Sequence, residues 1–167
     1  MNSVKRLDCI PAGSVISDGF GDIDYCESYE KSVQSQNKNI DRIVTDLLDL
    51  SFHSWIVGLK RSRDLIVGIF GLKADGKNAL INKECYYPVG SQAMIFTVIK
   101  RTSDEIVMGK DDKHLVFRFS VLLDQNASKV YVTTIVKFYN LGGRLYFAPV
   151  KPFHQFIVYS LIKHNLL

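Results

Sequence analysis

Several features that mark whole classes of protein are missing from this chain of 167 residues. Its three cysteines, Cys9, Cys26 and Cys85, are far apart and show no C-x-x-C or Cys/His spacing of the zinc type. The four histidines form no i, i+4 pair, so we expect no metal and no other cofactor. Free thiols in an odd number fit a reducing compartment, which predicts a cytoplasmic protein.

Long apolar runs and concentrated charge are also missing. No apolar run approaches the roughly 18 residues of a membrane span, and no apolar segment of a signal peptide follows Lys5 and Arg6. The formal charge of +4 comes from 21 basic and 17 acidic residues that are interspersed, with one dense basic patch at residues 60–63. We therefore expect neither a membrane span nor a nucleic-acid partner.

The chain is rich in apolar and aromatic residues. It is 47% hydrophobic and contains ten Phe and eight Tyr, which excludes disordered and low-complexity classes. A chain of this length buries roughly 70% of the surface of its unfolded form without a disulfide or metal. We expect one domain over residues 1–167.

The first half predicts one strand and two helices. Residues 15–20 form a candidate strand. The polar stretch 34–39 ends in a helix cap at Asn39, and apolar residues at three- and four-residue spacing then predict an amphipathic helix over residues 40–48. A second helix is expected from about Ser54 to Phe70.

In the second half the hydrophobic period changes to two, which predicts strands. Short polar connectors between them require antiparallel pairing. A fifth strand is expected at residues 144–148 and a closing helix from Pro152, because proline suits the first helical position. The four strands expected before these are residues 94–101, 105–110, 114–123 and 129–140.

This order of elements predicts an α+β protein in which a curved antiparallel sheet is covered by the C-terminal helix. With two shorter helices after the first strand, the arrangement resembles the helix-grip architecture of the Bet v 1-like and START-like proteins. Such folds often leave an apolar cavity between the sheet and the helix.

Several motifs in series resemble one family. They are G-K-D-D-K-H-L-V-F-R at residues 109–118, T-T at 133–134, N-L-G-G-R-L-Y at 140–146 and P-F-H at 152–154, preceded by a helical segment at 59–72. Together they are similar to the bacterial domain-of-unknown-function family 2867 (DUF2867), over roughly residues 10–165. The resemblance implies a Bet v 1-like fold and no known substrate.

The strand at 114–123 divides polar from apolar side chains by strict alternation. Phe117 and Phe119 belong to the face that must cover the core, whereas His114 and Arg118 lie on the other face. That second face is interpreted in three ways: a partly polar solvated surface, a subunit interface, or a face rotated inward by a bulge near residues 109–112.

Five residues are candidates for acid/base or electrostatic chemistry, and three of them also have a structural interpretation. Asp112 either caps a turn or orients His114 as a base. His154 is either a histidine hydrogen-bonded to the sheet or an acid/base group at a cavity mouth. Arg118 or Arg144 would stabilise an enolate, unless Arg144 simply pairs with Asp111 or Asp112.

The leading hypothesis is a module that binds an apolar small molecule or lipid in the cavity. A cyclase- or lyase-type enzyme that uses the His/Arg cluster and a domain that forms a homodimer through the open sheet face are the alternatives. The expected ligand-binding residues are the polar Asn140, Arg144, Tyr146 and His154 and the aromatic Trp55, Phe117, Phe119, Phe138, Phe153 and Phe156.

Overall fold

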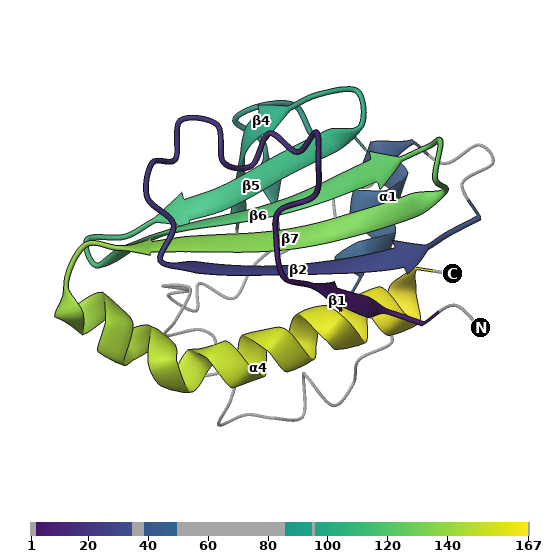
Figure 1. The fold of residues 1–167 in the computed structure, drawn as a ribbon. Helices are drawn as coiled ribbons and strands as arrows, with labels where there is room; N and C mark the ends of the chain where they lie inside the picture. The colour runs from purple at the N-terminus through teal and green to yellow at the C-terminus, as the bar shows by residue number, and fades with distance from the viewer. Residues whose placement is uncertain (1–2, 35–38, 50–85, 95, 167) are drawn as a thin grey trace.

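The computed structural model describes residues 3–34, 39–49, 86–94 and 96–166. Within these ranges the chain forms a twisted antiparallel sheet and two helices (Figure 1). The elements are β1 (Lys5–Leu7), β2 (Tyr25–Ser32), α1 (Ile40–Leu47), β3 (Gln92–Ala93), β4 (Phe96–Arg101), β5 (Glu105–Asp111), β6 (Leu115–Asp124), β7 (Lys129–Phe138) and α4 (Leu141–Asn165). The α+β class and the C-terminal helix are confirmed.

The sheet has seven strands in the order β1-β2-β7-β6-β5-β4-β3, and all neighbours are antiparallel. Strands β4 to β7 follow one another as hairpins, as the short connectors predicted, with ends within about two residues of the expected ones. The N-terminal β2 pairs with β7 and so brings the first part of the chain beside the last strand.

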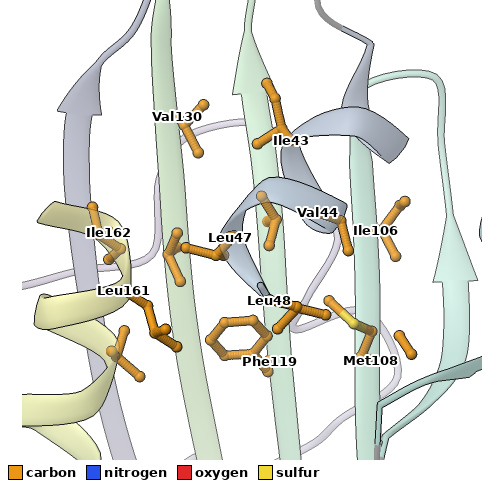
Figure 2. Close-up of a cluster of buried hydrophobic side chains, with 14 of the residues drawn as sticks. Ile43, Val44, Leu47, Leu48, Ile106, Met108, Phe119, Val130, Leu161 and Ile162 are labelled. Atoms are coloured by element: carbon orange, nitrogen blue, oxygen red, sulfur yellow. The ribbon is translucent and has the colours of Figure 1, made fainter. Parts of the chain in front are cut away.

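Helix α1 begins where its sequence predicts. Asn39 is the N-cap, and its side chain accepts a hydrogen bond from the amide of Arg42 at 2.9 Å. The buried side of α1 packs on the inner face of the sheet, where Leu47 and Leu48 lie near Phe119 (Figure 2). The expected helix over residues 54–70, and with it Trp55, lies outside the described residues.

The outer face of the sheet is covered by the chain itself. Residues 10–23, which we call the strap, cross this face between β1 and β2 (Figure 1). Ile16 of the strap is buried against Val107 and Ile135 of the sheet. The expected strand over residues 15–20 is therefore wrong: this segment runs through turns, and it anchors to the sheet by side chains rather than by strand pairing.

Strand β2 is missing from the sequence prediction for a physical reason. Its inward-facing residues, Tyr25, Glu27, Tyr29 and Lys31, alternate correctly but end in polar groups. Glu27 and Lys31 are almost fully buried. A pattern search for apolar alternation cannot recognise a strand whose buried face is charged.

Helix α4 begins eleven residues before the expected start at Pro152, and the expected strand at 144–148 is helical. Asn140 caps it by accepting a hydrogen bond from the amide of Gly143 at 3.0 Å. Helix propensities do not predict this helix, because it contains two glycines and two internal prolines, Pro149 and Pro152. Packing of its apolar side against the sheet outweighs these propensities.

Candidate functional site

A small enclosed pocket lies between the first half of α4 and the ends of β5 and β6. Its volume is about 40 Å³. The apolar walls come from Leu115 and Phe117 of β6 and from Phe147 and Val150 of α4. The polar lining residues are Lys110, Asp112, Tyr146 and His154.

His154 reaches this pocket from the middle of α4, not from its first turn as expected. Its Nδ1 atom lies 2.6 Å from Oε1 of Glu27 on β2, and both side chains are buried. The ring also meets the edge of Phe117 at a centroid distance of 5.7 Å. A carboxylate this close to Nδ1 favours the tautomer with its proton on that nitrogen, which makes Nε2 the ring atom for another partner.

Two tyrosines complete the surroundings of the Glu27 carboxylate. Tyr25 donates to Oε2 at 2.8 Å and Tyr29 donates to the same atom at 3.4 Å. Gln155 of α4 in turn donates to the Tyr25 oxygen at 2.9 Å. This cluster gives the carboxylate of Glu27, which is almost fully buried, three polar neighbours.

The pKa values of the cluster shift as this geometry requires. Burial by itself raises the pKa of the Glu27 carboxyl, but the contact with His154, the hydrogen bond from Tyr25 and the charge of Arg6 together outweigh it, and the net pKa is lowered. Burial and the Glu27 charge raise the pKa of Tyr25, and the same two causes raise that of Tyr29 to about 12. The tyrosines therefore stay protonated and act as donors.

Tyr146 and Asp112 lie at the more open side of the pocket. Burial, followed by the neighbouring charge of Asp112, raises the pKa of the Tyr146 hydroxyl. Asp112 also accepts a hydrogen bond from the backbone amide of His114 at 3.3 Å, which is the turn-capping role that its sequence position allowed. The imidazole of His114 is directed instead to the side chain of Asn140, so the Asp112–His114 dyad is not formed.

The structure separates the residues expected to act as a His/Arg cluster. Arg118 lies on the outer sheet face and pairs with Asp111. Arg144 pairs with Asp24 at 2.6 Å and not with Asp111 or Asp112. His114 is exposed at the start of β6, where its Nδ1 lies 3.2 Å from the side-chain amide of Asn140. Both arginines are thus paired with carboxylates, and Arg118 lies on the face of the sheet opposite His154, so these contacts give no support to an enolate site.

The aromatic residues expected to line a large cavity mostly fill the space instead. Phe117 and Phe119 stack on Phe96 at centroid distances of 5.5 and 6.2 Å. Phe138 packs at 5.4 Å from Phe147. Of the aromatic residues expected to bind ligand, Phe117 and Tyr146 line the pocket.

Phe153 and Phe156 do not point toward the sheet. Their exposed fractions are 45% and 58%, because the side of α4 that packs on the sheet carries Val150, His154 and Val158 instead. The expectation that these two phenylalanines line a cavity under the helix is therefore wrong.

The apolar residues on the sheet face of Arg118, which suggested a homodimer, are partly covered within one chain. Val116 and Ile135 are buried, and Ile135 packs with Ile16 of the strap. The strap thus covers part of the apolar surface that suggested a subunit interface.

No group of His, Cys, Asp or Glu suited to a metal occurs in the described residues, and neither helix there has the length and apolarity to cross a membrane.

Sequence reasoning named Asp112, Phe117, Tyr146 and His154 but missed Glu27, Tyr25 and Tyr29. The signal for these three was the alternation Y-x-E-x-Y-x-K over residues 25–31. This alternation places the three side chains, together with Lys31, on one face of a strand, and a helix can pack on that face.

Fold and site together define a protein in which a long C-terminal helix lies along an antiparallel sheet and encloses a small pocket with a buried histidine. The chain belongs to the family of proteins of unknown function DUF2867, whose model matches residues 20–161. No curated protein and no solved structure matches the chain. The motif resemblance seen in the sequence is confirmed at the level of this family.

Proposed function

We propose that this protein binds a small, mostly apolar molecule in the pocket under α4, with one hydroxyl group of the ligand directed at His154. The observation that carries the proposal is a buried histidine beside Glu27, in a pocket whose other buried lining residues are apolar. Pockets that bind small molecules combine apolar walls with few, well-placed polar groups in this way.

The Glu27 contact prepares His154 for such a ligand. Because Nδ1 faces the carboxylate, Nε2 is the ring atom left for the ligand. A ligand hydroxyl suits both charge states of the ring, since it donates to a neutral Nε2 and accepts from a protonated one. The order of strand, helix, hairpin strands and C-terminal helix supports a helix-grip, Bet v 1-like assignment, in which a ligand lies between sheet and helix.

The pocket limits the ligand's size. At about 40 Å³ it is far smaller than the roughly 300–1,000 Å³ of sites for drug-sized molecules. A short aliphatic chain, or one end of a longer molecule, fits this space. The walls formed by Leu115 and Val150 set the length that enters.

A series of primary alcohols from ethanol to hexanol tests this proposal by NMR titration of the full chain. We expect shifts at Leu115, Phe117 and Val150, and an affinity that rises by about fourfold for each methylene until the pocket is full. Val150→Ala should move this limit to a longer alcohol. Val158→Ala is the matched control, because Val158 is buried under the same helix but does not line the pocket.

Native mass spectrometry of protein purified without detergent gives an independent test. A discrete additional mass that is released on denaturation would identify the natural ligand. The proposal fails if no alcohol of the series shifts the pocket resonances, or if Val150→Ala and Val158→Ala change the length dependence equally.

A further inference from the structure

A second hollow lies on the other face of the sheet, beneath the strap. Its volume is about 300 Å³, at the lower end of the range for small-molecule sites. Val107 and Val116 of the sheet and Ile16 of the strap are lining residues and are nearly inaccessible to solvent. The sheet separates this hollow from the pocket of His154, so a binding site here does not rest on the proposed function.

Three positive side chains from three different strands line this hollow. They are Lys100 of β4, Arg118 of β6 and Lys137 of β7. Arg118 and Lys137 are diagonal neighbours on one face, because Val116 pairs with Lys137 and Ile135 pairs with Arg118. Like charges gathered on one sheet face repel each other, so this arrangement needs negative charge nearby.

The protein supplies negative charge from three carboxylates, and two of them, Asp18 and Asp111, line the hollow themselves. Lys100 pairs with Asp18, and Arg118 pairs with Asp111, whose side chains are 53% and 61% exposed. Lys137 lies 3.8 Å from Asp22, which is 99% exposed. Ion pairs with such solvated carboxylates are weak, and Lys137 has the loosest of the three.

Two glycines lie beside two of these cations. A β-carbon on Gly109 would lie 2.8 Å from Cδ and 2.9 Å from Nη1 of Arg118, so the absence of a side chain there lets the arginine lie flat across β5. A β-carbon on Gly21 of the strap would lie 3.4 Å from Nζ of Lys137. Gly109 thus leaves the space that the Arg118 side chain occupies, whereas Gly21 lies at an ordinary contact distance from Lys137.

Aromatic rings stand beside these charges. The Arg118 guanidinium lies 5.8 Å from the centre of the Phe20 ring, and Tyr139 also lines the hollow. Nη1 and Nη2 of Arg118 donate to the exposed carboxylate of Asp111, and Nη1 also donates to the carbonyl of Phe117. A ligand carboxylate at this planar guanidinium would therefore take the place of Asp111. The hollow therefore combines an apolar floor, aromatic sides and a lining of three positive and two negative side chains.

We propose that the hollow under the strap binds a small carboxylate with an aromatic or branched apolar body, its carboxylate bound by Arg118 and Lys137. The apolar body would lie on Val107 and Val116, and the ligand carboxylate would replace the exposed Asp111 beside Arg118 and add negative charge beside Lys137. Charge-assisted hydrogen bonds to arginine are among the stronger polar contacts in proteins.

NMR titration of the ¹⁵N-labelled chain with phenylacetate, benzoate and 3-methylbutanoate, each compared with its neutral amide, tests this site. We expect saturable shifts at Ile16, Val107 and Val116, and at least one carboxylate bound about tenfold more tightly than its amide. Lys137→Gln should weaken that binding about tenfold. Lys163→Gln, which changes an exposed lysine on α4, should leave it unchanged.

The position of the Ile16 amide resonance without ligand shows whether the strap is still in place in Lys137→Gln, so a loss of binding is assigned to charge rather than unfolding. The proposal is overturned if none of the three carboxylates gives saturable shifts, or if amides bind as well as carboxylates. It is also overturned if the Lys137→Gln chain, with its strap in place, binds like the wild type, or if the shifts map to Leu115 and Val150 of the other pocket.

Discussion

Gly143 in the first turn of α4 lies directly on the carbonyl oxygen of His114 at the start of β6, and a β-carbon on Gly143 would overlap that oxygen. The neighbouring Gly142 has more room, since its nearest contact would be the Asn140 side chain at 3.0 Å. The close approach places the beginning of α4, and with it Tyr146 and Phe147, against the strand ends that form the pocket.

This contact predicts opposite behaviour for two adjacent glycines. Gly143→Ala should lower the free energy of unfolding by about 1–3 kcal/mol, because backbone atoms must move apart. Gly142→Ala should cost little, since alanine favours a helix by about 0.5–1 kcal/mol over glycine and a side chain can adjust. Urea denaturation of both variants checks this, and equal costs would contradict the close approach.

The N-cap of α4 gives a second prediction. Asn140→Ala removes the acceptor for the Gly143 amide and should lower the free energy of unfolding by about 1 kcal/mol. Asn140→Asp keeps an acceptor at that place and should retain most of the stability. If both substitutions cost the same in urea denaturation, capping is not what Asn140 contributes.

The sequence predicts the hairpin strands and α1 well, because in these elements apolar residues alone decide which side is buried. Phe117 and Phe119 face the core as their alternation required. It fails for β2 and α4, where the buried or contacting residues are Glu27, Lys31 and Gly143. Their burial depends on partners that come from distant parts of the chain.

The candidate site was only half predictable for the same reason. His154 was recognisable as a polar residue among apolar ones, but its carboxylate partner lies 127 positions earlier in the chain. Motif spacing suggested Asp112, which is close to His114 in sequence. The carboxylate that lies beside a buried histidine is Glu27, which β2 brings to His154 by pairing with β7.

Attachment of the strap depends on Glu105, which predicts a local rather than a global effect. This buried carboxylate accepts hydrogen bonds from the Ser14 hydroxyl at 2.6 Å and from the Val15 amide at 2.7 Å. Glu105→Gln should accelerate hydrogen exchange at Val15 and Ile16 much more than at the amides of β6. Uniform acceleration along the chain would show that Glu105 supports the whole sheet rather than the strap.

The buried pair under α4 predicts a large effect on stability. Glu27→Gln removes the charge beside His154 and should lower the free energy of unfolding by about 3 kcal/mol, because it leaves a buried partner uncompensated. Glu30→Gln is a control on the same strand, and its pairs with the more exposed Lys5 and Lys129 should be worth about 0–1 kcal/mol. If both substitutions lower the free energy of unfolding by similar amounts in urea denaturation, the Glu27–His154 pair does not contribute more than a surface ion pair.

The same pair predicts how stability depends on pH. The folded protein lowers the pKa of Glu27 below its ordinary 4.5, so the unfolded chain takes up this proton more readily than the folded one. The stabilisation is therefore complete above about pH 4.5 and is lost as the pH falls through the lower pKa of the folded state. Glutamine at position 27 has no such proton to bind, so the stability difference between the wild type and Glu27→Gln should narrow as the pH is lowered below this value. Urea midpoints measured between neutral and acidic pH check this, and a difference that stays constant would mean that the Glu27 carboxylate contributes by packing rather than by its charge.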